Sequence, residues 1–166
     1  LVGDNQYRSN TNVFDGGIIR GGNGLRKAWS QTPAYMAFPY YIVWKLDGLQ
    51  TVNKLVMYTD YEYPMMTPKK FDIISSTANM TIPTANVTIN PGALKYDSNW
   101  NVIQTVEETQ SYRGGWVTND DGTKTTDNKT YTFPSTETKF IGIKVYSHMT
   151  TQYANGKIEE IVFYGP

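Results

Sequence analysis

Apolar and polar residues alternate with a period of two along several stretches of this chain. In residues 138–147, Ile141, Ile143 and Val145 fall on one face, and the residues between them fall on the other. In the last stretch, residues 156–165, Ile161 and Phe163 share a face in the same way. This period is typical of half-buried β-strands. We therefore expect two strands at the C-terminus, joined by a polar and aromatic loop at 147–155, with the terminal strand buried in a sheet.

Similar patterns predict further strands along the chain. Their expected ranges are 40–46, 52–60, 71–76, 98–108 and 129–135, with a short edge strand near Val87. Asp47-Gly48 is a strong turn signal between the first two of these strands. Two polar insertions, 77–97 and 109–129, interrupt the series. With no amphipathic helical pattern, the chain is expected to be all-β, an antiparallel β-sandwich of seven or eight strands.

Length, charge and composition narrow the classes of protein to which this chain can belong. The 166 residues show no repeat and no linker, so we expect one domain over residues 1–166. Fifteen basic and fifteen acidic residues leave no net charge, which argues against a nucleic-acid partner. There is no cysteine for a disulfide or thiolate zinc site, and no apolar run of membrane-spanning length. The sequence does not begin with Met, so we expect a piece of a larger protein.

Aromatic residues are abundant, with 13 Tyr, 4 Trp and 6 Phe making up 14% of the chain. A composition rich in aromatic residues suits strands and extracellular loops better than helices. Many of these rings must lie at or near the surface, which favours a binding protein.

The order of motifs along the chain resembles one known family. The motifs are VFDGG at 13–17, a Pro-led YYIVWKLDG at 40–48, TVNKLVMYT at 51–59, KKFDIISS at 69–76, DSNWNVI at 97–103, TKFIGIKVYS at 138–147 and IEEIVFYG at 158–165. In this order they resemble the discoidin domains (coagulation factor type C domains) and the related family 32 carbohydrate-binding modules. The resemblance implies a galactose-binding-domain-like jelly roll with about eight core strands. It also implies binding of carbohydrate, membrane lipid or protein through loops at one end, without catalysis.

Three departures from the family pattern bear on ligand binding. Lys45 stands where the family usually has Asp, and Gly17 stands where it usually has a second Asp or Asn. The Arg that many sugar-binding members carry after the second long strand has no counterpart in residues 61–69. The ligand-binding residues of the family therefore do not transfer to this chain as a set.

Two carboxylates match positions that hold a structural calcium ion in the carbohydrate-binding branch of the family. Asp15 lies in the DG turn, and Glu160 lies in the closing motif. Calcium takes six to eight oxygens, so these carboxylates together with carbonyls and hydroxyls could hold it. The alternative is that Asp15 caps a turn and that Glu160 forms a salt bridge or faces water.

Sugar recognition uses exposed aromatic rings that stack on pyranose faces, with polar groups beside them for the hydroxyls. The candidates lie in three predicted loops: Tyr61, Tyr63, Arg113, Trp116, His148 and Tyr153. The alternative for each tyrosine is surface packing, and a lone histidine is more often a hydrogen-bonding loop residue. The other tryptophans, Trp29, Trp44 and Trp100, are expected to pack against the core.

Catalysis is not expected. The acidic pairs 107–108, 120–121 and 159–160 are adjacent residues, and on a strand such neighbours point to opposite faces. A glycosidase instead needs two carboxyl groups that face each other. No nucleophile-elbow motif is present.

We therefore expect a non-catalytic carbohydrate-binding module whose partner is a glycan. Its location is expected to be extracytoplasmic: secreted, cell-surface or periplasmic. The alternative is a protein-interaction, adhesion or lipid-binding module of the same fold. The apolar stretches 35–38 and 64–70 suit insertion into lipid. The chain has no net positive charge to attract an anionic membrane, so we expect a sugar ligand before a lipid one.

Overall fold

In the computed structural model, the chain forms antiparallel β-strands that build two layers. The structure describes residues 29–30, 38–58, 67–79, 87–89, 99–109, 116–118, 124–126, 128–149, 157–158 and 160–166. Within this part of the chain no residue is helical. The strands are β1 (Trp29–Ser30), β2 (Tyr40–Tyr58), β3 (Pro68–Ser76), β4 (Val87–Ile89), β5 (Asn101–Glu107), β6 (Trp116–Thr118), β7 (Lys124–Thr126), β8 (Asn128–His148), β9 (Lys157–Ile158) and β10 (Glu160–Tyr164).

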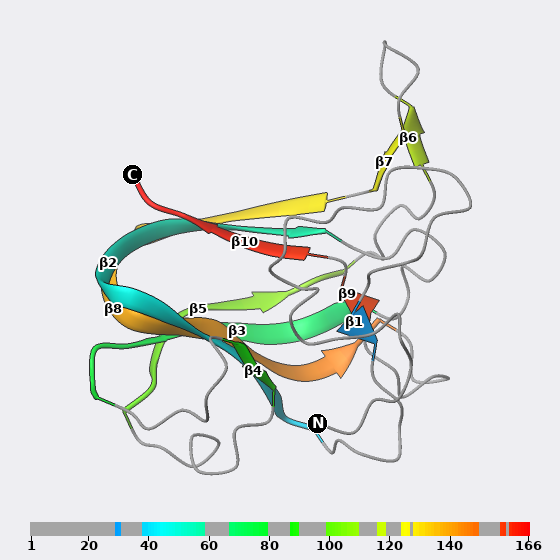
Figure 1. Cartoon of the computed structure of the whole chain (residues 1–166). Coiled ribbons are helices and arrows are strands. Elements are labelled where there is room, and N and C mark those ends of the chain that lie inside the picture. Colours follow the sequence, from blue (N-terminus) through cyan, green and yellow to red (C-terminus); the bar gives the residue numbers. More distant parts are fainter. Residues whose placement is uncertain are drawn as a thin grey trace.

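Two long strands, β2 and β8, pass through both layers, because each folds over at the left of Figure 1. The upper layer in that view holds β10, the second half of β2 and the first half of β8. The lower layer holds the first half of β2, the second half of β8, and β3, β4 and β5. The two short pairs β1–β9 and β6–β7 form separate two-stranded sheets. The expected antiparallel β-sandwich is confirmed.

The fold-over of β2 occurs at residues 46–49. The pairing of β2 with β8 shifts register between Lys45 and Gln50, and Gly48 has a positive φ of 81°. Glycine has no Cβ to oppose this conformation, so the strand turns here at low steric cost. The Gln50 amide donates to the carbonyl of Asp47 at 2.9 Å, which closes the bend.

On β8 the corresponding bend is held by the buried hydroxyl of Thr138. Its Oγ1 accepts a hydrogen bond from the backbone N–H of Ser76 at 3.1 Å. The same oxygen lies 2.6 Å from the carbonyl oxygen of Phe140, to which it can donate. A buried backbone donor without a partner would be costly. The hydroxyl of Thr138 supplies that partner at the point where the pairing of β3 with β8 ends.

The main core lies between the layers, and inward-facing residues of the two long strands form most of it. The buried members are Tyr40, Ile42, Val52, Leu55, Met57, Phe71, Ile73, Val106, Tyr131, Phe133, Ile141, Ile143, Val145, Ile158 and Ile161. Trp44 and Phe163 pack against this core on the side where β2 and β8 bend. The predicted inward faces of the strand segments 52–57 and 141–145 are confirmed.

A second hydrophobic cluster lies on the outer face of the lower layer. Tyr41, Val43, Ile74 and Phe140 are buried there, and Trp100 packs against them. Gly142 lies between the paired residues Val43 and Ile74. A Cβ at this position would approach the carbonyl oxygen of Ile42 to 2.2 Å, so only glycine lets the strands come this close.

Two sequence predictions about strand boundaries are wrong. The Asp47-Gly48 signal marks a bend within β2 and not a reversal between two strands. The predicted strands 129–135 and 138–147 are likewise one strand, β8. The reason is the same in both cases: each half buries an inward face, but the two halves belong to different layers.

The two strands nearest the C-terminus do not pair with each other. β10 pairs with the second half of β2, with Ile161 opposite Met57, and not with β8. By contrast, the short edge strand near Val87 is confirmed as β4, which pairs with β2. The core placement of Trp44 and the packing of Trp100 are confirmed as well.

Candidate functional site

The end of the sandwich opposite the two bends, here called the open end, gathers the ends of most long strands. At this end β2, β3 and β10 begin at Tyr40, Pro68 and Glu160, and β5 ends at Glu107. β8 both begins and ends there, because it runs out through the upper layer and back through the lower one (Figure 1). All connections that leave these strand ends therefore start from one end of the molecule.

Most of the predicted sugar-contact residues lie in segments attached to the open end. Tyr61 and Tyr63 follow β2, Arg113 follows β5, and Tyr153 follows β8; these four lie outside the described residues. Trp116 begins β6, where it pairs with Thr126, but its side chain is not described. The described strand ends bring the attachment points of these segments together, and the sugar contacts themselves stay predictions.

His148 ends β8 at the open end and is buried, with 5% of its surface exposed. Its Nε2 lies 2.8 Å from the hydroxyl of Tyr40, the first residue of β2. The ring of Phe38 meets the imidazole edge-on, with centroids 4.9 Å apart and planes at 73°. A side chain buried this far suits a supporting position under the surface better than direct contact with a sugar. Its partners Phe38 and Tyr40 lie far back along the chain, so the local sequence around His148 does not indicate them.

Burial also decides the protonation of this pair. Burial lowers the pKa of His148 from 6.5 to about 4, so its ring is neutral at neutral pH. Burial raises the pKa of Tyr40 well above its usual value, so its phenol stays protonated. Among the described residues, Nδ1 of His148 is buried and has no hydrogen-bond partner.

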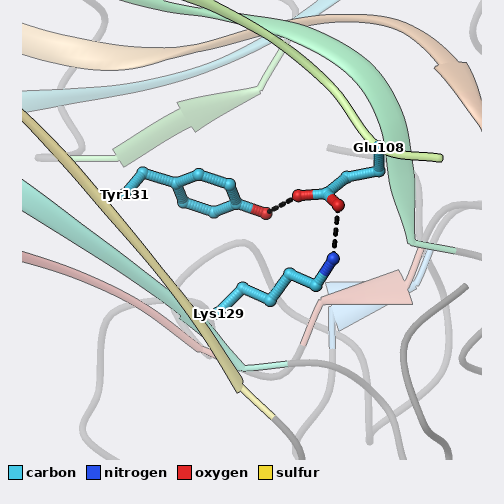
Figure 2. A network of polar contacts seen from close by, with 3 residues as sticks. All are labelled: Glu108, Lys129 and Tyr131. Atoms are coloured by element: carbon cyan, nitrogen blue, oxygen red, sulfur yellow. Dashed lines mark hydrogen bonds and ion pairs between the residues drawn. The ribbon is translucent and has the colours of Figure 1, made fainter. Parts of the chain in front are cut away.

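A polar network joins the two layers at the open end. Figure 2 shows Glu108, just after β5 of the lower layer, between two residues of β8 in the upper layer. The hydroxyl of Tyr131 donates to Oε1 of Glu108 at 2.8 Å, and the ammonium of Lys129 contacts Oε2. The Glu108 side chain is 13% exposed, so both of its oxygens find partners where water is scarce. The network holds the two layers in a defined relation at this end.

Tyr131 links this network to the core. Its ring packs edge-on against Phe71 of β3, with centroids 5.4 Å apart. The ring is therefore buried between the layers while its hydroxyl reaches the carboxylate. Nothing in the local sequence around Glu108 indicates this role, because its partners lie 21 and 23 residues further along the chain.

A second polar cluster lies on the outer face of the lower layer. Asp72 is buried and accepts hydrogen bonds from Thr105 at 2.7 Å and from Tyr146 at 2.5 Å. Beside it, Lys144 lies over the rings of Tyr146 and Tyr41 at 5.1 and 5.6 Å. Burial works to lower the pKa of Lys144, but hydrogen bonds with the two tyrosine hydroxyls raise it above its usual value. This cluster is satisfied internally and stabilises the sheet.

The calcium prediction is not decided by the described residues. No group of three or more potential metal-ligating side chains occurs in the part of the chain that the structure describes. Asp15 lies outside that part, and for Glu160 the structure gives the backbone position, opposite Tyr58 at the start of β10.

The bent-strand sandwich, with its strand ends gathered at one end, defines the class of β-sandwich to which this fold belongs. Three solved structures share it over nearly the whole chain. Chitosan-binding module 2 from the chitosanase/glucanase of Paenibacillus sp. IK-5, solved with chitotriose, superposes with a TM-score of 0.61 at 17% identity, covering 97% of this chain and 89% of that one. The Streptococcus pneumoniae β-galactosidase BgaA gives a TM-score of 0.65 at 13% identity, covering 99% of this chain and 91% of that one.

The third is the family 32 carbohydrate-binding module of AlyQ in complex with 4,5-unsaturated mannuronic acid. Its TM-score is 0.53 at 15% identity, covering 95% of this chain and 86% of that one. The predicted fold, that of family 32 modules, is thus confirmed. No family model and no curated protein sequence matches the chain.

We predict that His148 makes folding stability depend on pH. Because its pKa is about 4 in the folded state and near 6.5 when unfolded, the unfolded chain binds the extra proton first as pH falls. Its contribution is complete above pH 6.5, and about 3 kcal/mol is lost by pH 4. Urea unfolding at pH 7, 6 and 5 measures this loss. His148→Gln should remove that part of the pH dependence; an unchanged slope would contradict the prediction.

A second prediction concerns the network around Glu108. Lys129→Met leaves a largely buried carboxylate with one partner fewer, so we expect a loss of about 2 kcal/mol in the free energy of unfolding. The matched control is Lys70→Met, which breaks the exposed ion pair with Glu107 at 3.4 Å and should cost under about 1 kcal/mol. Equal losses in urea unfolding would show that the network at the open end carries no special stability.

Proposed function

We propose that this chain is a non-catalytic carbohydrate-binding module that binds glycans through the open end of its sandwich. The observation that carries the proposal is the shared fold with modules solved in complex with chitotriose and with 4,5-unsaturated mannuronic acid. These modules bind different sugars on one fold, and their identity to this chain is 17% and 15%. The fold therefore supports sugar binding in general and leaves the particular sugar to the loops.

The distribution of aromatic residues supports the open end as the binding surface. Tyr61, Tyr63 and Tyr153 belong to segments whose flanking strands reach that end. Arg113 and Trp116 follow β5, which also ends there. Rings supply stacking surface and Arg supplies hydrogen bonds to hydroxyls, which is the combination that sugar sites use.

The arrangement of one adjacent pair of carboxylates, Glu107 and Glu108, supports a non-catalytic role for this domain. Glu107 faces outward and pairs with Lys70, and neighbouring Glu108 faces inward to Lys129 and Tyr131. Each acid is committed to a structural partner, and the two point in different directions. A glycosidase mechanism needs two carboxyl groups on opposite sides of one bond.

The same fold and composition support an extracytoplasmic location, within a larger secreted or surface protein. Two of the matched structures come from a chitosanase/glucanase and a β-galactosidase, which act on glycans. A neutral chain with many aromatic residues suits a glycan surface better than an anionic membrane or a nucleic acid. Within the described residues, no helix is long and apolar enough to cross a bilayer.

The function is tested by glycan-array and calorimetric binding with the 166-residue domain. We expect the wild type to bind at least one oligosaccharide, and Tyr61→Ala/Tyr63→Ala to weaken that binding by about tenfold or more through lost ring contacts. The control Tyr164→Ala removes an exposed tyrosine at the far end of β10 and should leave affinity unchanged. A wild type that binds no glycan at millimolar concentration would refute the function.

We further propose one structural calcium ion between Asp15 and Glu160. If it binds the folded chain, added Ca²⁺ raises the melting temperature by mass action, and a chelator lowers it again. Asp15→Asn and Glu160→Gln should each abolish this Ca²⁺-dependent shift, whereas Asp47→Asn, at the exposed bend of β2, should keep it. A melting temperature that does not respond to Ca²⁺ would exclude the site.

A further inference from the structure

We propose that Phe38 is a sugar-stacking residue of the open end, held in place by His148 and Tyr40 beneath it. This inference rests on the proposed function and gives a role to a residue that the sequence places in an apolar stretch suited to lipid insertion. It also states the class of ligand: a pyranose that presents an apolar C–H face.

The first support is the position of Phe38 among exposed apolar side chains. In the described residues four large hydrophobic side chains are exposed: Phe38, Leu49, Val102 and Tyr164, at 43%, 49%, 55% and 38%. Leu49 lies at the bend of β2, Val102 lies near the start of β5, and Tyr164 ends β10, all away from the open end. Of the four, Phe38 is the one that lies where the loop-bearing strand ends converge.

The second support is that Phe38 rests on fixed groups. Its ring centroid lies 4.9 Å from that of His148, edge-on, and 5.8 Å from that of Tyr40, tilted by 32°. The two supporting rings are buried, and a 2.8 Å contact between the Tyr40 hydroxyl and Nε2 of His148 ties them together. A ring that is already ordered loses little rotamer freedom when a ligand stacks on it, which favours binding.

The third support is the chemistry of this ring cluster. Phe38 is apolar, and the cluster beneath it carries no charge at neutral pH. On β3, Pro68 lies opposite His148, and the carbonyl of Thr67 accepts a hydrogen bond from the backbone N–H of Met149 at 3.1 Å. Of the charged side chains at the open end, Lys69 and Lys70 are exposed, Lys70 is paired with Glu107, and Glu108 is paired with Lys129. An uncharged exposed ring suits the C–H face of a sugar.

The experiment compares Phe38→Ala with Phe38→Trp in the same domain. The probes are immobilised chitotriose, galactose-terminated and uronate oligosaccharides, followed by calorimetry on the best-bound probe. We expect Phe38→Ala to weaken binding about tenfold and Phe38→Trp to stay within about threefold of the wild type, because a larger ring keeps the stacking surface. Leu49→Ala is the matched control, an equally exposed apolar side chain at the opposite end, and should bind as the wild type does.

The outcomes separate this inference from the proposed function. If the wild type binds a glycan and Phe38→Ala binds it equally well, the stacking role is refuted and the function stands. If the wild type binds no glycan, both are refuted. If the wild type instead binds phosphatidylserine vesicles and loses them with Phe38→Ala, the ring belongs to a lipid-inserting surface and the inference is overturned. Thermal melting of each variant tests whether folding is retained, because Phe38→Ala also removes the ring contacts with His148 and Tyr40.

Discussion

The pairing of β2 with β8 across both layers is the constraint on which the rest of the structure depends. Each strand supplies inward-facing residues to both halves of one core, so neither layer forms without the other. Their bends require a positive φ at Gly48 and a threonine hydroxyl at 138 that satisfies backbone groups of β3 and β8. The close approach at Gly142 then keeps β2 and β8 in register within the lower layer.

The bends also decide at which end of the sandwich the connecting segments begin. Because both long strands fold over at one side, that side is closed by continuous backbone, with Trp44 and Phe163 packed behind it. The opposite side collects strand ends and the segments between them. A rigid scaffold with variable connections at one end is how many folds carry binding sites. The Glu108 network and the ring cluster under Phe38 give that end fixed anchor points.

Patterns that are local to one strand predict its structure correctly, and features that depend on distant partners are not encoded in those patterns. Alternation and β-branched residues over a few positions predict the inward faces at 52–57 and 141–145 and the edge strand at Val87. The bend at Asp47-Gly48 carries the same residues as a hairpin turn, so only the shared partner β8 distinguishes the two. Likewise Glu108 and His148 owe their burial to residues 21 to 108 positions away.

The sequence alone determined the all-β class, the inward faces of the strands and, through the order of its motifs, the antiparallel β-sandwich. These properties depend on the period of apolar residues and on turn chemistry, which act over short distances along the chain. Only the tertiary structure decided that two pairs of predicted strands are single bent strands and that β10 pairs with β2. It also decided that His148 lies buried beneath an exposed Phe38. Such pairings depend on which faces meet across the core, and alternation within one strand does not encode its partner.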